Sequence, residues 1–256
     1  MKKTIMILVF LASSVNLALS AEDAQDPRGL FYKANSLYEQ REYEKASEEY
    51  AKILNIDSES GPLYFNIGNT FFKMGKIGYA ILAYKKAQRL MPGDGDLKSN
   101  LAYAQSLTED SALQLPSQNR VAWFFKFPFR EYSLNTVSII LIALYIMLMV
   151  MLLAGIIYPA FKRRMAILFY PLLIGFFLTL GAFIIRYYNE EILSHGVVVA
   201  KEAECKYEPI DKSNNYFTLK EGQEALVLKT RSGWRRIRRL DGKLAWVKSD
   251  AVEEID

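Results

Sequence analysis

The sequence contains very few of the residues that build metal centres and covalent active sites. Cys205 is the only cysteine and His195 the only histidine among 256 residues. One cysteine excludes an intrachain disulfide, and one cysteine with one histidine cannot form a Cys/His metal site or a histidine-based triad. No motif with a catalytic mechanism and no paired carboxylates in a recognisable setting are present. We therefore expect a protein that is not an enzyme and holds no metal or cofactor, with carboxylate-only chemistry as the open alternative.

Two long stretches lack charge altogether. Residues 134–158 and 165–185 are apolar and contain no Asp, Glu, Lys, Arg or His. Each is long enough to cross a bilayer as a helix, which takes about 20 residues. A buried hairpin of a soluble protein is the alternative, but core helices usually keep a polar face and neither stretch has one. Without ionisable groups inside the spans, we expect an anchor rather than a transport path.

The loop between the two stretches predicts their orientation. Residues 159–164 include Lys162, Arg163 and Arg164, and short basic loops stay in the cytoplasm. The segments on both sides of the hairpin then lie on the outer side of the membrane.

The start of the chain agrees with this orientation. Residues 1–20 combine Lys2 and Lys3, an apolar run and small residues before Ala21, which is typical of a secretory signal peptide. An uncleaved signal anchor is the alternative, and it would add a span without changing any side.

The net charge of +4 follows from these boundaries. Six basic residues at the ends of the apolar runs supply more than the whole positive excess: Lys2, Lys3, Lys162, Arg163, Arg164 and Arg186. The rest of the chain is slightly acidic. We therefore do not expect a nucleic-acid partner.

Residues 21–108 contain an internal repeat. Residues 61–94 resemble a tetratricopeptide (TPR) repeat, whose pattern is W-x2-L-G-x2-Y, then A-x3-F, then P, and whose period is 34 residues. Residues 27–60 repeat the pattern in register, and 95–108 match a first helix and are predicted to cap the stack. The matching positions are Tyr64, Ile67, Gly68, Phe71, Ala80, Tyr84 and Pro92, preceded by Leu30, Lys33, Ala34, Leu37, Ala46, Tyr50 and Ser58.

The TPR resemblance implies a peptide-binding groove. In that family the concave face of the stack holds peptides or partner segments, and Asn35 and Asn69 would hydrogen-bond a peptide backbone. The alternative is that the aromatic members only pack between helices. Some members of the family clamp a carboxylate with a lysine at the position that Phe31 occupies here. We therefore do not expect a carboxylate clamp in this chain. The candidate groove residues are Phe31, Asn35, Tyr38, Phe65, Asn69, Phe72 and Tyr103.

Residues 109–133 are predicted to form a linker and a segment at the membrane interface. The first part is polar and contains Pro116. Aromatic residues interleaved with Lys126 and Arg130 follow, directly before the first span. Such interleaving can also bind single-stranded nucleic acid, but an interfacial aromatic belt is the simpler interpretation at this place.

Residues 196–256 change to short β-type runs. The candidate strands are 197–199, 225–228, 234–237 and 245–247, with turns at Gly222, Ser232-Gly233 and Asp241-Gly242. The stretch LKEGQEALVLKTRSGWRRIRRLDGKLAWVKSDAVEEI resembles a bacterial SH3 domain. Ala245 replaces the usual glycine before Trp246, and the early R-x-G-P motif is replaced by residues 205–209. These departures argue against transferring the cell-wall-binding role of that family.

Four arginines form the densest charge cluster of the chain: Arg235, Arg236, Arg238 and Arg239. They are interpreted either as a solvated strand or as the contact for an acidic partner.

The expected fold class is multidomain α + β, with an α-helical TPR solenoid, a two-helix transmembrane hairpin and a small SH3-like β-barrel. This order of segments resembles the BatE-type protein of the Bat (Bacteroides aerotolerance) operons. The resemblance implies a non-enzymatic scaffold in the bacterial inner membrane with both domains in the periplasm. It would work beside von Willebrand A-type membrane proteins and a MoxR-type ATPase, in an aerotolerance or envelope-stress system. The alternative function is a cell-wall tether that binds peptidoglycan through the SH3-like domain.

Overall fold

The computed structural model describes residues 26–56, 59–108, 129–158 and 162–255. The predicted signal peptide, most of the predicted linker and the first half of the predicted basic loop lie outside these residues. The chain divides into a compact unit that ends at Glu59 and a second that runs from Ser60 to Asp256.

The first unit is a helical hairpin. Helix α2 (Pro27–Glu39) and helix α3 (Tyr43–Asn55) pack against each other through Ala34, Ala46 and Tyr50, all nearly inaccessible to solvent. Asp26 caps α2 by accepting hydrogen bonds from the backbone N–H groups of its first turn.

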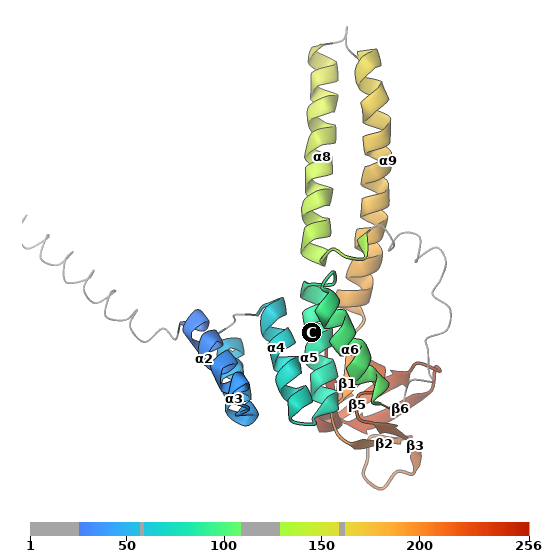
Figure 1. The fold of residues 1–256 in the computed structure, drawn as a ribbon. Helices are drawn as coiled ribbons and strands as arrows, with labels where there is room; N and C mark the ends of the chain where they lie inside the picture. Colours follow the sequence, from blue (N-terminus) through green and yellow to red (C-terminus); the bar gives the residue numbers. More distant parts are fainter. Residues whose placement is uncertain (1–25, 57–58, 109–128, 159–161, 256) are drawn as a thin grey trace, which may run out of the picture. The chain divides into compact units, whose positions relative to one another are not determined.

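The second unit begins with three helices, labelled in Figure 1. Helices α4 (Gly61–Lys73) and α5 (Ile77–Leu90) form a hairpin, and α6 (Gly95–Ser106) packs mainly on α5. Ser60 and Asp94 cap α4 and α6, each accepting a bond from a backbone N–H three residues later.

The two helical hairpins share the same turn, 34 residues apart. Arg41 and Gly75 both adopt a left-handed backbone, with φ of 63° and 74°. In each turn the next residue donates its N–H to a carbonyl five residues earlier, from Glu42 to Leu37 and from Lys76 to Phe71. This bond closes the C-terminus of a helix that ends in a left-handed residue. The repeat found in the sequence is therefore also a repeat of backbone geometry.

Two long apolar helices follow. Helix α8 (Leu134–Ile157) and helix α9 (Lys162–Tyr187) lie side by side (Figure 1) and are long and apolar enough to cross a membrane. Most of their side chains are exposed in the structure, and only a few are buried between them, including Val137 and Ala182. The predicted basic loop residues from Lys162 onward form the first turn of α9, because Lys and Arg are good helix formers.

Arg186 connects the C-terminal end of α9 to the residues that precede α8. Its guanidinium donates to Glu190 at 2.7 Å, to the carbonyl oxygen of Phe129 at 3.3 Å and to the carbonyl oxygen of Tyr132. The side chain is only 9% exposed, so these bonds satisfy a nearly buried cation. A short π-helix, η4 (Tyr188–Ile192), then leads to the sheet.

Seven antiparallel strands follow in the described part of this unit. They are β1 (His195–Val198), β2 (Glu202–Lys206), β3 (Asn215–Lys220), β4 (Glu224–Arg231), β5 (Trp234–Arg239), β6 (Leu244–Lys248) and β7 (Val252–Glu254). Their order in the sheet is β3-β2-β6-β5-β4-β1-β7. Ser232 and Gly233 form the two-residue turn between β4 and β5, both with positive φ, as the favoured hairpin turn requires.

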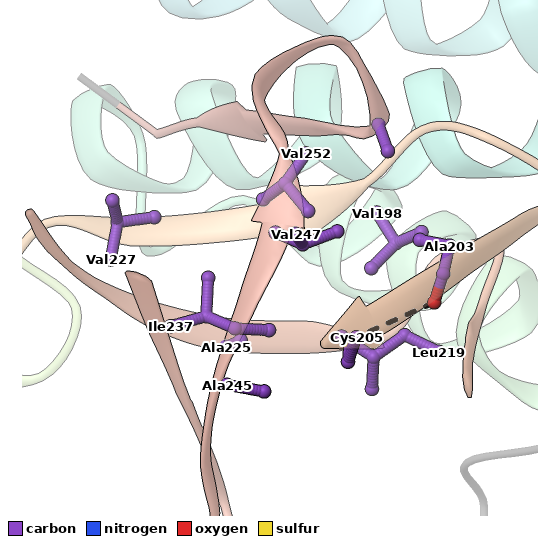
Figure 2. Packing of buried hydrophobic residues seen from close by; sticks show 11 residues of the cluster. Val198, Ala203, Cys205, Leu219, Ala225, Val227, Ile237, Ala245, Val247 and Val252 are labelled. Carbon is purple, nitrogen blue, oxygen red and sulfur yellow. Dashed lines mark hydrogen bonds between the residues drawn. The ribbon is translucent and has the colours of Figure 1, made fainter. Parts of the chain in front are cut away.

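The sheet surrounds one apolar core, shown in Figure 2, but it is not closed. Leu219 of the end strand β3 and Val252 of the other end strand β7 both belong to this core, together with Ile237 and Val247 from the middle of the sheet. Within the described residues no pairing joins β3 to β7. The predicted SH3-like barrel is thus not confirmed, whereas a mixed α + β fold is.

The sheet packs against the helices of its own unit. The N–H of Gly78 in α5 donates to the Glu221 carboxylate at 2.8 Å. A Cβ on Gly78 would lie 2.5 Å from the carbonyl oxygen of Val198, so only glycine allows this approach. The Glu224 carboxylate meets Lys85 at 2.8 Å and Gln105 at 3.1 Å. Helices α5 and α6 and the sheet therefore form one body, although the apolar helices separate them in the sequence.

Candidate functional site

The seven predicted groove residues all lie on the first helices of successive pairs. Three are in α2 (Phe31, Asn35 and Tyr38), three in α4 (Phe65, Asn69 and Phe72), and Tyr103 is in α6. The residues in α2 belong to the first unit and the other four belong to the second.

In the first unit, the predicted residues contact the second helix of their own pair. The hydroxyl group of Tyr50 donates to Oδ1 of Asn35 at 2.5 Å, and the ring of Phe31 meets the ring of Tyr50 edge-on, with centroids 6.1 Å apart. Tyr38 contacts Tyr43 in the same way at 5.4 Å. Desolvation, and secondarily the Tyr43 phenol, raise the pKa of Tyr38 above its ordinary value. All three predicted residues are half-buried.

In the second unit, Asn69 makes the equivalent bond and one more. Its Oδ1 accepts from the hydroxyl group of Tyr84 at 2.7 Å and from Nδ2 of Asn100 in α6 at 2.9 Å. An amide oxygen has two lone pairs, and both are used here. Asn69 can therefore contact a peptide only through its amide N–H groups. Asn100 was not predicted, because its sequence position matches no element of the repeat pattern.

Aromatic side chains continue along the same helices. The rings of Phe72 and Tyr103 lie 5.6 Å apart, and Phe65 lies 6.1 Å from Tyr84. Tyr103 is 58% exposed, whereas Phe65 and Phe72 are half-buried. Tyr103 is thus the member of the set most available to a ligand, while Phe65 and Phe72 also serve packing.

The repeated Asn–Tyr bond is the feature that the two units share at these positions. Asn35 and Tyr50 are 15 residues apart, as are Asn69 and Tyr84, and the second pair follows the first by the 34-residue period. The residue before each asparagine is small, Ala34 in the first pair and Gly68 in the second. A Cβ on Gly68 would lie 2.5 Å from the Tyr84 ring. The bond therefore fixes the spacing of the two helices and the orientation of the amide together.

The four arginines of β5 separate into two kinds. Arg235 donates to the carbonyl oxygens of Ser249 and Val252 and pairs with Glu254 at 3.1 Å, which fastens β7 to the sheet. Arg239 pairs with Asp241 in the following turn and holds the pKa of that carboxyl near 2. Arg236 and Arg238 are exposed and have no acidic partner among the described residues. Only this second kind remains available to an external partner.

A second aromatic cluster lies on the sheet domain. The rings of Tyr207 and Tyr216 are 4.5 Å apart and tilted by 33°, and both side chains are exposed. Arg239 lies over the ring of Phe217 and Lys243 over that of Tyr216. Tyr207 belongs to the segment that replaces the early SH3 motif, and the sequence pattern alone gives it no further role.

The only cysteine is not a reactive group. Cys205 is fully buried, and its Sγ lies 3.7 Å from the carbonyl oxygen of Ala203 (Figure 2). Burial raises the pKa of its thiol to about 12. Among the described residues there is also no group of three or more His, Cys, Asp or Glu side chains that could hold a metal ion.

Comparison of the sequence with models of known protein families gives no match, and comparison with curated proteins gives none either.

Proposed function

We propose that this protein is a non-enzymatic, membrane-anchored scaffold whose helical repeats bind a segment of another protein. The repeated Asn–Tyr bond, at the 34-residue spacing, supports the proposal most directly. A TPR-type stack predicts such equivalence, because each repeat presents the same position on the same face. Within each helix pair, the amide of Asn35 or Asn69 and the aromatic rings beside it would contact an extended peptide.

The anchor in this proposal is the hairpin α8–α9, placed in the inner membrane of a bacterium. The predicted signal peptide and the basic residues from Lys162 to Arg164 support a periplasmic location for the repeats and the sheet. The close packing of α5 on β1 supports a common side for both domains, as a hairpin anchor requires.

The partners follow from the resemblance to BatE-type proteins. We propose von Willebrand A-type membrane proteins and a MoxR-type ATPase system as the assembly in which the scaffold acts, in aerotolerance or envelope stress. The repeat positions and the order of segments support this part of the proposal.

The experiment compares two double variants with the wild type by co-purification from native membranes in mild detergent. Asn35→Ala with Asn69→Ala removes both the amides and the internal bonds. Tyr50→Phe with Tyr84→Phe removes the internal Tyr–Asn bonds and leaves the amides in place. If each lost hydrogen bond to the partner costs about 0.5–1.5 kcal/mol, the asparagine variant should bind roughly 5- to 150-fold more weakly. The tyrosine variant should retain its partners at matched helicity. If both variants recovered as much partner as the wild type, the repeats would not be the partner-binding site.

The exposed tyrosine pair favours one second function, a peptidoglycan tether. Two neighbouring, exposed phenol rings such as Tyr207 and Tyr216 offer apolar surfaces with polar tips, which suit sugar rings. Retention of the detergent-solubilised chain on purified peptidoglycan, lost in Tyr207→Ala with Tyr216→Ala, would support the tether. The scaffold function predicts no retention.

A further inference from the structure

One face of the sheet carries four cations that have no acidic partner among the described residues. Lys229 of β4 lies opposite Arg236 of β5, and Arg236 lies opposite Trp246 of β6. Directly opposite residues share a face of an antiparallel sheet, and positions two residues apart along a strand share it too. Arg231 and Arg238 therefore join Lys229 and Arg236 on this surface, which we call the basic face. All four cations are exposed.

The basic face is the part of the outer sheet surface that α5 and α6 leave open. Glu224, at the start of β4, lies on the covered part and is engaged by Lys85 and Gln105. The core lies on the opposite surface, with Ile237 and Val247. Two apolar side chains stand beside the cations, Leu228 at 46% and Leu244 at 43% exposure. An exposed combination of cations and apolar residues is typical of a surface that meets a lipid interface.

The chain ties this face closely to the end of α9. Only Leu193 and Ser194 separate the π-helix from His195, the first residue of β1. His195 lies opposite Leu226, and Leu226 lies opposite Arg238. Two strand spacings amount to about 10 Å, so the nearest cation of the basic face is within about one Debye length of the point where the sheet begins.

We propose that the basic face binds the headgroups of anionic phospholipids in the membrane that holds the hairpin. The inference rests on the proposed membrane anchor and adds a lipid contact to it. Guanidinium groups bind phosphate bidentately, and each basic residue near an anionic bilayer surface strengthens binding roughly fivefold. Because the hairpin already holds the domain at the bilayer, a few such contacts are enough to fix its orientation.

The test uses the full chain carrying Leu244→Cys, labelled with an environment-sensitive fluorophore and reconstituted in vesicles. Leu244 is exposed and lies opposite Arg238 on the basic face, and the native Cys205 is buried, so the label reports this face. Brominated lipids should quench the label in phosphatidylcholine vesicles that contain phosphatidylglycerol, and much less in vesicles of phosphatidylcholine alone. High salt should abolish the difference.

Variants separate charge from structure. Arg236→Gln with Arg238→Gln should lower the apparent affinity for phosphatidylglycerol roughly 25-fold, whereas Arg236→Lys with Arg238→Lys should largely retain it. Lys201→Gln with Lys212→Gln, two exposed cations outside the strands, is the matched control and should behave as wild type. Quenching that does not depend on phosphatidylglycerol, or that is unchanged in the arginine-to-glutamine variant, would overturn the proposal. A fluorescence response to a soluble acidic peptide alone, without any response to vesicles, would overturn it too. Failure of the chain to reconstitute at all would instead contradict the membrane anchor.

Discussion

At the scale of single residues, the closest packing lies where Gly68 meets Tyr84. The sequence predicts a small residue at this position and places Ala80 opposite it, but the nearest side chain is the Tyr84 ring. We expect Gly68→Leu to force α4 away from α5 and to lower the free energy of unfolding by roughly 1–3 kcal/mol, as overpacking does. Thermal melting of the chain in detergent, followed by circular dichroism, measures the loss.

Gly95 provides the control for this change. It also lies in a helix of the second unit, but a Cβ there would have no neighbour within 4 Å. Gly95→Leu should therefore melt close to the wild type. Equal melting of the two variants would show that Gly68 does not set the spacing of the helices.

A second prediction concerns Cys205. Because burial raises the pKa of its thiol from 9.0 to about 12, the folded form keeps a proton that the unfolded form releases above about pH 9. The contribution of the protonated Cys205 thiol to the free energy of unfolding is therefore fully present below pH 9 and is lost as the pH rises from 9 toward 12. At neutral pH, maleimide should modify Cys205 only after denaturation, whereas a cysteine in place of the exposed Leu244 should react in the folded chain. Rapid labelling of the native wild type would contradict the buried position of the thiol.

The asparagines show what a repeat pattern can and cannot predict at this scale. The 34-residue period identifies Asn35 and Asn69 as equivalent, and the structure places them equivalently within their pairs. The pattern treats them as surface residues, yet their oxygens are bonded to buried tyrosines. Hydrogen bonds between side chains 15 residues apart depend on how two helices pack, which the period alone does not specify.

At the scale of elements, the sequence predicts long periodic or apolar segments well and short polar strands poorly. The two apolar stretches and the strand candidates near β1, β4, β5 and β6 all correspond to elements of the structure. Strands β2, β3 and β7 were not predicted. Strand β2 alternates strictly, but its core positions are the small residues Ala203 and Cys205, and β7 has only three residues. Such strands form because neighbouring strands pair with them, which is a tertiary effect.

The contact between helix and sheet gives the prediction for this scale. Glu224→Lys should place a cation against Lys85 and leave Gln105 without its acceptor. Because both side chains of the pair are about one quarter exposed, we expect a loss of roughly 1–3 kcal/mol, between the values for surface and buried pairs. Adding Lys85→Glu should restore part of it. Hydrogen exchange of α5 measures the effect, and unchanged protection in Glu224→Lys would mean that this contact does not hold the sheet to the helices.

At the scale of the whole molecule, the hairpin and the contact between α5 and the sheet make one joint prediction. Reporter fusions after residue 110 and after residue 256 should both behave as exported, and a fusion at Arg164 should behave as cytoplasmic. Helix α5 and strand β1 can meet only if both ends lie on the same side of the membrane. An exported signal from the Arg164 fusion would reverse the proposed orientation, and opposite signals from the two ends would exclude the hairpin.

No feature of the sequence predicted that the helices and the sheet join. The pairs that form the contact, such as Gly78 with Glu221, are 143 residues apart. Gly78 itself gives no signal, because a glycine in the first turn of a helix is as compatible with exposure as with close packing. Composition and periodicity describe segments one at a time, whereas this contact depends on the matching surfaces of two segments.

The distance in sequence between α5 and the sheet also determines when the molecule becomes complete during synthesis. The surface of α5 around Gly78 leaves the ribosome long before β1 and β4, and both apolar helices are made in between. In the proposed topology, that surface therefore stays uncovered until the last strands have followed the second span across the bilayer. A chain whose second span fails to insert would hold its sheet on the wrong side and keep the unshielded helix exposed to proteases. In the proposed topology, closure of this contact would thus distinguish chains whose second span has crossed the bilayer from chains in which it has not.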